Sequence, residues 1–443
     1  MLIYYIICVF GLPVILIMRL TFCGHCLRNG NGYAIITKNT KRCTNIYEVN
    51  NMSDYRDVER LMHHFMEMKD GPVGCAVSIS QGEEVLFENS YGYADCQKSK
   101  ELTPDALFRQ FSTTKVIAAL CGMIQYERGY FLMNDPVSDY LPEYKHMQVQ
   151  VPRPDGGWDL VESEEPILMR HAFSMGVGML AHDGSPADLE MQRIRESMGG
   201  TKICNKYDHL TEIRAFGAVP MLWEPGTHWQ YGQGLDIMAA VVEATSGMGL
   251  GDFMKKEIFD PLGMKDTAYR LTGDMKDRLV DCTVRNEKGE LEAYPTDIMD
   301  RCCQPDAIYE CAATGLISSL GDYAKFARML ANGGRLGDVQ IVGRKTIDLM
   351  RRNQLTDEQL KEFQDGPYRA GYGYGMGVRT MMDPAAGGSN GSVGEFGWSG
   401  LLGTWVAVDP DEKTSIVYMH QNWPNWEEYA HLRLRAVANG LFR

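Results

Sequence analysis

The sequence predicts an α+β fold in which one antiparallel sheet, flanked by terminal helices, is interrupted by an all-helical insertion. Near both ends of the chain apolar residues recur with a period of two, which is typical of strands. Between these regions the period is close to that of an α-helix. Because strands from distant parts of a chain can share an antiparallel sheet, the two strand-rich ends are expected to pair with each other.

The first half of the expected sheet follows an amphipathic helix that begins near Met52. In this helix Val58, Leu61 and Phe65 recur at helical spacing. The strands that follow are expected at Val73–Ser80, Glu84–Tyr93 and Leu107–Phe111. The last of them runs directly into Ser112, where the helical pattern begins.

The insertion, residues 112–364, is expected to be mostly helical. Residues 131–230 are rich in loops with short helical pieces. Longer helices are expected at Thr113–Tyr130, Leu235–Thr245, Leu250–Phe259, Leu320–Asn332 and Gly343–Arg352. The α/β part, residues 52–111 and 365–443, resumes with strands at Tyr372–Met381, Gly394–Trp398, Gly403–Val408 and Thr414–His420, then a closing helix at Trp426–Leu441.

Composition and charge exclude several classes of protein. The 443 residues are 44% hydrophobic and 23% charged, which argues against a disordered or collagen-like chain. The formal net charge of −14 argues against a nucleic-acid partner, since phosphate binding needs clustered Lys and Arg. Residues 1–51 differ, because their net charge is +4, which leaves −18 for the rest of the chain.

Two interpretations stay open for this N-terminal extension. Residues 1–18 contain no charged side chain, which just reaches the length of a membrane-spanning helix. Pro13 interrupts the run, and no Lys or Arg precedes it as a secretory signal requires. Residues 1–51 are therefore either a membrane anchor or the result of a start misassigned upstream of Met52. In both cases residues 52–443 are expected to be the catalytic domain, located in the cytoplasm.

The cysteine pattern favours reduced thiols. Of the twelve cysteines, several lie inside apolar runs, as Cys75 and Cys121 do, which is typical of buried thiols in a cytoplasmic protein. Residues 23–26 match the C-x-x-C redox pattern, yet they lie in a basic segment without a βαβ context. The histidines show no paired-ligand spacing, so neither a metal nor an organic cofactor is expected.

Ser112-Thr113-Thr114-Lys115 is a candidate catalytic motif. Ser112 lies where an expected strand meets a very apolar helix, so its neighbouring backbone N–H groups can stabilise negative charge. Lys115 is three residues further on, which places it on the same helical face. A desolvated lysine can act as a base for the serine. The alternative, a helix-capping serine with an exposed lysine, fits these four residues equally well.

Two further segments decide between these interpretations. They are Glu224-Pro225-Gly226-Thr227-His228-Trp229-Gln230-Tyr231-Gly232-Gln233 and Pro261-Leu262-Gly263-Met264-Lys265-Asp266-Thr267. Together with Ser112–Lys115, they resemble the serine β-lactamase and penicillin-binding-protein-like superfamily, in the branch of class C β-lactamases and family VIII carboxylesterases. Ile167–Met179 and Ala313–Gly334 extend the resemblance, which covers about residues 55–440.

The resemblance implies a β-lactamase/transpeptidase-like fold and a set of catalytic roles. Ser112 corresponds to the nucleophile, and Lys115 and Tyr231 to the two groups that share the proton transfer. The backbone N–H groups of Ser112 and Leu401 correspond to the oxyanion hole.

The third motif of the family corresponds to residues 397–404, where β-lactamases carry K-T-G. Here Trp398 replaces the lysine, so the position offers an apolar face and one N–H donor and favours a neutral acyl substrate. Gln233 stands where β-lactamases carry asparagine. The residues assigned to substrate binding are Gln233, Trp398, Ser399 and Gly400.

The sequence thus predicts a serine hydrolase that cleaves small, largely neutral carboxylic esters through an acyl-enzyme on Ser112. The alternatives are a class C-like β-lactamase or D-alanyl-D-alanine peptidase, an acyltransferase, and a non-catalytic penicillin-sensor module. A second serine motif, Gly387–Gly391, matches G-x-S-x-G but lacks the strand and helix that a nucleophile elbow requires. The expected partner is a small-molecule ester, with membrane contact only through residues 1–18. The oligomeric state stays open.

Overall fold

The computed structural model describes residues 3–9, 12–18, 55–180, 183–199, 203–366 and 368–442. The chain divides into two compact units, Met1–Met52 and Ser53–Arg443. In the first unit, β1 (Ile3–Val9) and β2 (Leu12–Met18) pair as an antiparallel hairpin, so the described part of the uncharged segment is extended rather than helical. The C-x-x-C segment at 23–26 lies outside the described residues. In the described ranges, no helix is long and apolar enough to cross a membrane.

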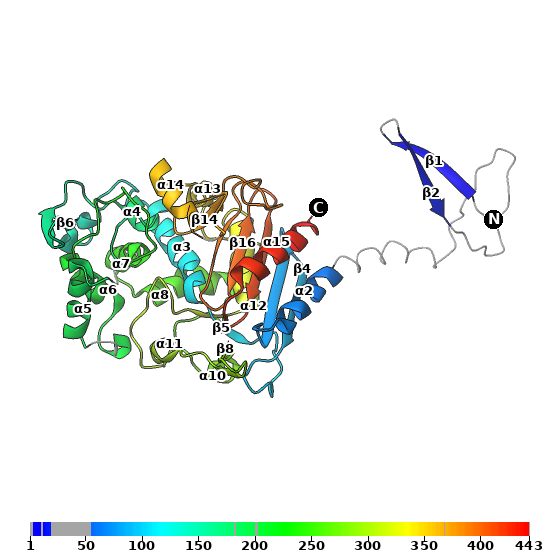
Figure 1. Cartoon of the computed structure of the whole chain (residues 1–443), viewed down its shortest axis with the longest axis horizontal. Helices are drawn as coiled ribbons and strands as arrows, with labels where there is room; N and C mark the ends of the chain where they lie inside the picture. Colours follow the sequence, from blue (N-terminus) through cyan, green and yellow to red (C-terminus); the bar gives the residue numbers. More distant parts are fainter. Residues whose placement is uncertain are drawn as a thin grey trace. The chain divides into compact units, whose positions relative to one another are not determined.

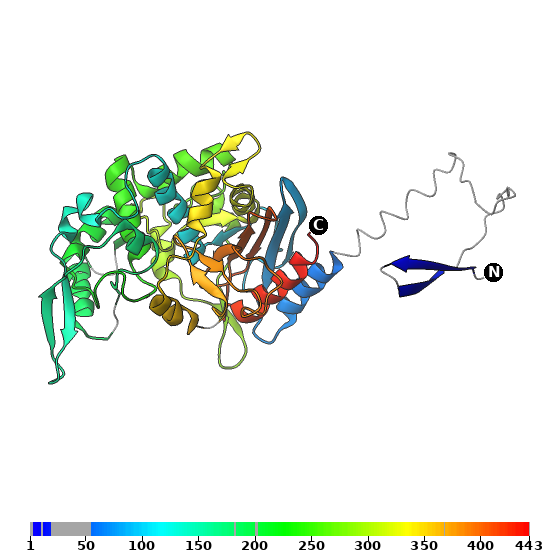
Figure 2. The same ribbon diagram turned by 90° about the horizontal axis from the view of Figure 1, so that it is seen from above.

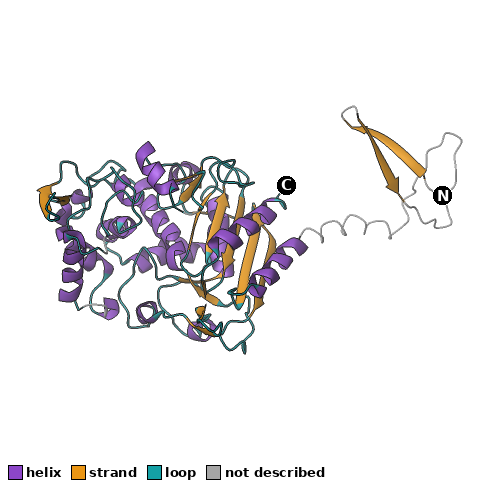
Figure 3. Ribbon diagram, viewed as in Figure 1, coloured by secondary structure: helices purple, strands orange, loops and turns teal. Residues whose placement is uncertain are grey.

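The second unit is built around a seven-stranded antiparallel sheet (Figures 1 and 3). Its strand order is β13–β14–β15–β16–β17–β3–β4. The strands are β3 (Gly74–Gln81), β4 (Glu84–Gly92), β13 (Tyr372–Tyr374), β14 (Arg379–Met381), β15 (Phe396–Ser399), β16 (Trp405–Asp409) and β17 (Thr414–Met419). The N- and C-terminal halves of the chain meet where β17 pairs with β3, with Val417 opposite Ser78. The predicted joining of both ends in one sheet is confirmed.

The two terminal helices cover one face of this sheet. Figure 2 shows α2 (Arg56–Glu67) and α15 (Leu432–Asn439) side by side. Val58 and Phe65 of α2 pack with Trp405 and Tyr418 from the sheet, and each of these side chains is at most 1% exposed. The helical spacing of apolar residues after Met52 therefore serves to bury one stripe of α2 on the sheet.

The helices of the insertion begin on the opposite face. There α12 (Leu320–Ala331) packs on β16, β17 and β3. The helix that follows Ser112, α3 (Thr114–Glu127), packs against α7 (Gly234–Ser246). Both α3 and α7 are buried on nearly all sides, because apolar residues surround them. The predicted α+β class, with a sheet flanked by terminal helices, is confirmed.

The insertion is mainly but not entirely helical, which corrects the expectation of an all-helical subdomain. Its remaining helices are α4 (Met169–Phe173), α5 (Pro186–Ser197), α6 (His209–Ala215), α8 (Leu250–Met254), α9 (Asp260–Leu262), α10 (Met275–Arg278), α11 (Asp297–Cys302), α13 (Arg344–Met350) and α14 (Asp357–Gln364). It also contains short strands: β6 (Gln148–Pro152) pairs with β7 (Trp158–Glu162), and β11 (Arg335–Leu336) pairs with β12 (Val339–Gln340). Two further small sheets join it to the α/β part, since β10 (Ile317–Ser319) pairs with β5 (Leu107–Arg109), and β8 (Thr283–Arg285) pairs with β9 (Leu291–Ala293) and with β18 (Asn422–Trp423).

The expected single strand over Tyr372–Met381 is wrong, because two strands form there. The chain turns between β13 and β14, where Gly377 adopts a φ of +75° that favours glycine. The Gly375 N–H donates to the carbonyl of Val378 and closes this turn at 2.7 Å. The segment over Tyr372–Met381 therefore makes a hairpin instead of one continuous strand.

The expectation that all cysteines are reduced is also corrected. Cys204 and Cys302 form a disulfide between the segment before α6 and the end of α11. The free cysteines of the described chain include Cys75 and Cys121, which are fully buried as predicted. Burial raises the pKa of Cys75 to about 12, so this thiol stays neutral and unreactive at physiological pH.

Candidate active site

Ser112 lies at a tight junction between a strand and a helix. The chain runs from β5 through a 3₁₀ turn, η1 (Phe111–Thr113), into α3. Phe111 adopts a φ of +47°, which is energetically costly for a bulky residue. Its buried ring packs with Cys282 and Leu402, and this packing holds the turn in place. The nucleophile candidate therefore sits on a rigid, sharply turned segment.

Ser112, Lys115 and Tyr231 lie in mutual contact. The Tyr231 hydroxyl donates a hydrogen bond to Ser112 Oγ at 2.8 Å. Lys115 Nζ is 3.5 Å from Ser112 Oγ and lies over the Tyr231 ring, 4.5 Å from its centroid. Only 3% of Lys115 is exposed, so the alternative of a solvent-exposed lysine does not hold. The ammonium can thus stabilise negative charge on either oxygen.

The loop that carries Tyr231 is held by α14, a helix that the sequence pattern did not reveal. Gln359 of α14 donates through its side chain to the His228 carbonyl at 3.1 Å. Glu362 accepts from the Trp229 N–H at 2.7 Å, and its other carboxylate oxygen contacts the His228 ring. These contacts fix the backbone two and three residues before Tyr231, which limits the motion of the phenol.

Trp398 of β15 contacts Tyr231 directly. Its indole N–H donates to the Tyr231 hydroxyl oxygen at 3.3 Å, and the two rings stack with centroids 5.6 Å apart. Gly400 follows β15 directly. Any side chain at this position would place its Cβ only 2.6 Å from the Gln110 carbonyl oxygen. Strand β15 therefore ends directly against the segment that leads into Ser112, which requires glycine at position 400.

The turn after β15 presents the Leu401 backbone. The Gly400 N–H donates to the Thr404 carbonyl at 2.7 Å, and the Gly403 N–H donates to the Gly400 carbonyl at 3.0 Å. Between them, the Leu401 N–H has no protein acceptor within the described part of the chain. A free backbone donor in a turn packed beside the Ser112 segment is what an oxyanion hole needs. The role of Leu401 stays a prediction.

The other predicted substrate-binding residues have less direct positions. Gln233 precedes the first residue of α7 and is half-buried. The Ser399 hydroxyl donates to Glu427 at 2.7 Å, so this side chain is engaged with the C-terminal segment of the fold. Across the described residues, no group of three His, Cys, Asp or Glu side chains could hold a metal ion.

Sequence reasoning missed the contacts on the far side of Lys115. Lys115 Nζ donates to the Ala313 carbonyl at 2.7 Å, and the Ala313 N–H donates to Asp236 at 3.1 Å. Burial works to raise the pKa of Asp236, but the hydrogen bond and charge of His209, together with Lys115, hold that pKa below its usual value. An acidic residue inside the otherwise apolar pattern of α7 was the available signal, since buried carboxylates normally need a partner.

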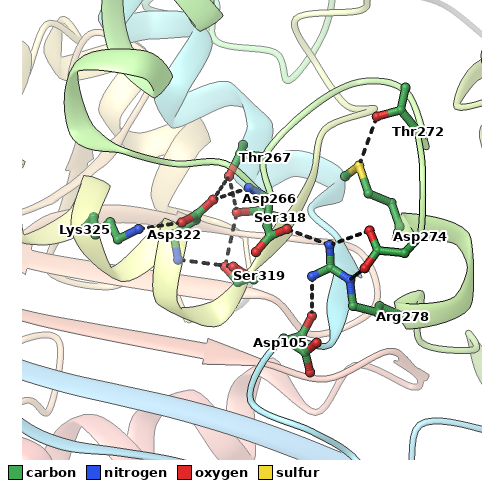
Figure 4. Close-up of polar contacts among 11 residues, drawn as sticks. Asp105, Asp266, Thr267, Thr272, Asp274, Arg278, Ser318, Ser319, Asp322 and Lys325 are labelled. Carbon is green, nitrogen blue, oxygen red and sulfur yellow. Dashed lines mark hydrogen bonds and ion pairs between the residues drawn. The ribbon is translucent and has the colours of Figure 1, made fainter.

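The P-L-G-M-K-D-T segment stabilises the strand pair beside Ser112 (Figure 4). The Thr267 hydroxyl is 2.7 Å from the Ser318 hydroxyl, and Asp322 accepts from Thr267 at 3.3 Å and from the Asp266 N–H at 2.6 Å. Ser318 belongs to β10, the partner of β5. This buried network therefore holds β10 in register with the strand that leads to Ser112.

The competing serine motif has no catalytic geometry. Ser389 lies in a run of turns between β14 and β15, and its hydroxyl accepts from the Gly391 N–H at 3.0 Å. Neither a strand before it nor a helix after it positions the hydroxyl as a nucleophile elbow does.

Comparison with known proteins decides the family. The family model described as Beta-lactamase matches residues 58–440. The chain belongs to the beta-lactamase family. Two curated relatives are protein Rv1367c of Mycobacterium tuberculosis, 25% identical over 80% of this chain and 86% of that protein, and esterase EstB of Burkholderia gladioli, 27% identical over 76% and 83%.

A solved structure has the same fold as this chain. The hydrolase EstCE1, described as having promiscuous acyltransferase activity, superposes with a TM-score of 0.73. Its identity is 22%, and the superposition covers 88% of this chain and 100% of that chain. This match shows that the chain shares the fold of that hydrolase.

Proposed function

We propose that this protein is a serine hydrolase that cleaves carboxylic esters of small, largely neutral substrates through an acyl-enzyme on Ser112. The observation that carries the proposal is the contact of Ser112 Oγ with the Tyr231 hydroxyl at 2.8 Å, beside the buried Lys115 ammonium. A serine activated by an adjacent base is the arrangement that nucleophilic catalysis requires. The relationship to esterase EstB supports an ester as substrate.

In each half of the proposed reaction, Tyr231 accepts one proton from the nucleophile and returns it to the leaving group. Tyr231, as a phenolate beside the Lys115 ammonium, takes the Ser112 proton while Ser112 Oγ attacks the ester carbonyl. The N–H groups of Ser112 and Leu401 stabilise the tetrahedral oxyanion. The carbon–oxygen bond to the alcohol then breaks, and Tyr231 returns the proton to the leaving alkoxide. Water repeats these steps on the acyl-enzyme and releases the carboxylic acid.

The substrate preference rests on Trp398. Where β-lactamases carry a lysine, this chain places an indole that stacks on Tyr231 and donates to its oxygen. An indole contributes apolar surface and no positive charge, so it favours an uncharged acyl group over a carboxylate-bearing one. We assign Gln233, Ser399 and Gly400 to the surrounding substrate-binding surface.

The test compares wild type with Ser112→Ala on a panel of p-nitrophenyl esters of increasing acyl length, with the cephalosporin nitrocefin alongside. We expect hydrolysis of short esters, weak nitrocefin turnover, and loss of about 10⁴-fold or more in kcat for Ser112→Ala. Ser389→Ala is the matched control, because it removes the serine of the competing motif, and it should retain wild-type rates. Nitrocefin turnover that rivals ester hydrolysis would identify a β-lactamase instead. Fluorophosphonate labelling that survives Ser112→Ala, or no labelling at all, would exclude the hydrolase.

Acyl transfer is a second candidate, favoured by the acyltransferase activity in the description of EstCE1. The same acyl-enzyme would pass its acyl group to an alcohol in place of water. Adding short-chain alcohols to the ester assay separates the two activities. Hydrolysis predicts mainly free acid, whereas acyl transfer predicts the new ester as the main product.

We also propose that the enzyme is cytoplasmic, with membrane attachment through residues 1–18 as the alternative. Six free cysteines in the described ranges support a reducing compartment, whereas the Cys204–Cys302 disulfide fits an oxidising one. Fractionation of cells that express the full-length chain tests this. Recovery of Ser112-dependent labelling in the membrane fraction, resistant to high salt, would favour the anchor.

A further inference from the structure

A row of buried charged residues reaches Lys115 through the backbone of Ala313. The row consists of Glu243 and Asp236 on α7 and His209 at the start of α6. His209 is completely buried, with Nδ1 2.7 Å from Glu243 and Nε2 3.4 Å from Asp236. Asp236 is 3% exposed and Glu243 is 6% exposed. One imidazole thus bridges two carboxylates in the interior of the protein.

The backbone of Ala313 connects this row to Lys115, because its N–H contacts Asp236 and its carbonyl contacts Lys115. Asp236 Oδ1 accepts hydrogen bonds from the Ala313 N–H at 3.1 Å and from Cys311 Sγ at 3.3 Å. The carbonyl of Ala313 accepts from Lys115 Nζ at 2.7 Å. Asp236 therefore holds the backbone segment whose carbonyl faces the Lys115 ammonium.

The charges along the row alternate in sign. Burial works to lower the pKa of His209, but its close contact with Asp236, its hydrogen bond with Glu243 and the negative charges of both carboxylates raise that pKa to about 10. His209 is therefore an imidazolium at neutral pH, between two carboxylates, with Lys115 as the next cation. Buried ion groups are inefficient stabilisers compared with apolar side chains of the same size, so stability alone does not account for this row.

We infer that Glu243, His209 and Asp236 form a positioning unit for Lys115. Asp236 orients the Ala313 carbonyl, and this carbonyl positions the Lys115 side chain against Tyr231. His209 and Glu243 hold Asp236 in place and keep its carboxylate ionised. In this arrangement Lys115 is the positively charged neighbour of Tyr231, and Tyr231 is the group that exchanges a proton with Ser112. The inference rests on the proposed serine hydrolase function.

The decisive variant is Asp236→Asn, which keeps the size of the side chain and an oxygen for the Ala313 N–H but removes the charge. We expect kcat to fall about 10- to 100-fold, since small displacements of catalytic groups have effects of this size, with KM within about twofold of wild type. The rate at which a fluorophosphonate labels Ser112 should fall by a similar factor, because that rate reports activation of the nucleophile alone.

Glu395→Gln is the matched control. Glu395 is equally buried, at 5% exposed, and pairs with Arg435 at 2.9 Å without contact to the row. This variant removes a buried carboxylate charge elsewhere, so it should lower thermal stability while kcat and the labelling rate stay at wild-type values. A fall in kcat as large as that of Asp236→Asn would show that general destabilisation explains both.

Glu243→Gln keeps the inference testable if Asp236→Asn does not fold. It removes the outer charge and leaves the contacts among Asp236, Ala313 and Lys115 in place, and we expect a fall in kcat of about 3- to 10-fold at unchanged KM. In the variant that carries both Asp236→Asn and Glu243→Gln, the fall in kcat should be smaller than the product of the two single falls, because both residues act through Lys115. Wild-type kcat and labelling in Asp236→Asn, a rise in KM alone, or independent effects in the double variant would overturn the inference. Absence of Ser112 labelling in wild type would instead overturn the proposed function on which it rests.

Discussion

Tyr231 stands between a cation and an indole, and this position determines its chemistry. Lys115 Nζ lies over its ring, and the Trp398 N–H and the Ser112 hydroxyl are both within hydrogen-bonding distance of its oxygen. A proton acceptor needs its proton donor within hydrogen-bonding distance, and Ser112 meets this requirement. At the scale of single residues, the geometry therefore favours Tyr231 as the proton acceptor of the proposed reaction.

Replacing Tyr231 with phenylalanine tests this role directly. Tyr231→Phe keeps the ring that stacks on Trp398 but removes the oxygen, so we expect kcat to fall by about 10²- to 10⁴-fold, the usual contribution of a general base. Steady-state ester hydrolysis measures the effect, and Tyr130→Phe, which changes a half-exposed phenol on the surface, serves as control. Retention of more than about a tenth of the wild-type kcat would rule out Tyr231 as the principal base.

His209 predicts a defined pH dependence of stability. Its pKa in the folded protein, about 10, lies above the value of an unfolded histidine. Protonation of His209 therefore stabilises the fold below about pH 6.5, and this stabilisation is lost as the pH rises towards about 10. Urea unfolding of wild type and His209→Gln should show a large difference in free energy of unfolding near pH 6 and a smaller one near pH 10. A difference that does not change with pH would contradict a buried imidazolium.

At the scale of elements, short strands and one helix hold the catalytic groups. The pair β5–β10 leads to Ser112, and α14 holds the loop of Tyr231. The long helices and most strands could be predicted, because their apolar residues recur with a clear period. The helix α14 could not, because Asp357–Gln364 is largely polar and owes its place to a capping box at Thr356 and to contacts with residues far away in the sequence.

Thr267 provides a test at this scale. Thr267→Val keeps the shape of the side chain but leaves Ser318 and Asp322 without its hydroxyl, so the free energy of unfolding should fall by about 1–3 kcal/mol. Urea titration measures this fall, and KM for a short ester should stay near wild type because the buried Thr267 hydroxyl is engaged with Ser318 and Asp322 and is not assigned to the substrate-binding surface. Thr272→Val is the control, since among the residues that the structure describes the Thr272 hydroxyl contacts only the sulfur of Met275, at 3.7 Å. Equal stability of the two variants would contradict the structural role of the network.

At the scale of the whole molecule, residues from both ends of the chain build one sheet. Strand β17 lies between β16 and β3, so the N-terminal strands cannot complete the sheet without the C-terminal ones. The compact unit of Ser53–Arg443 contains the sheet, its covering helices and every residue assigned to the proposed site. The extension at Met1–Met52 forms a separate unit.

A chain shortened to begin at Met52 should therefore retain folding and activity. We expect its Tm to lie within about 2 °C of the full-length value, because no buried residue of the sheet or its helices is removed. Fluorophosphonate labelling should occur at the same rate, and the shortened Ser112→Ala chain is the control. Loss of folding or of labelling would show that residues 1–51 take part in the catalytic unit.

Local chemistry is what the sequence by itself determined. The three-residue spacing of Ser112 and Lys115, the apolar helix after them and the alternating strands at both ends are properties of neighbouring residues, so they can be read without the fold. The resemblance then added Tyr231 and Trp398, which lie more than a hundred residues from Ser112.

Only the tertiary structure decided which groups surround Lys115. Asp236 and Glu243 interrupt the apolar pattern of α7, which indicates that they need partners but does not identify them, and Ala313 contributes only its backbone. Their contacts form because α6, α7 and the segment before β10 pack together in the interior. A packed interior brings distant residues within hydrogen-bonding distance without leaving a periodic signal in the chain, since each such contact depends on the whole arrangement of helices.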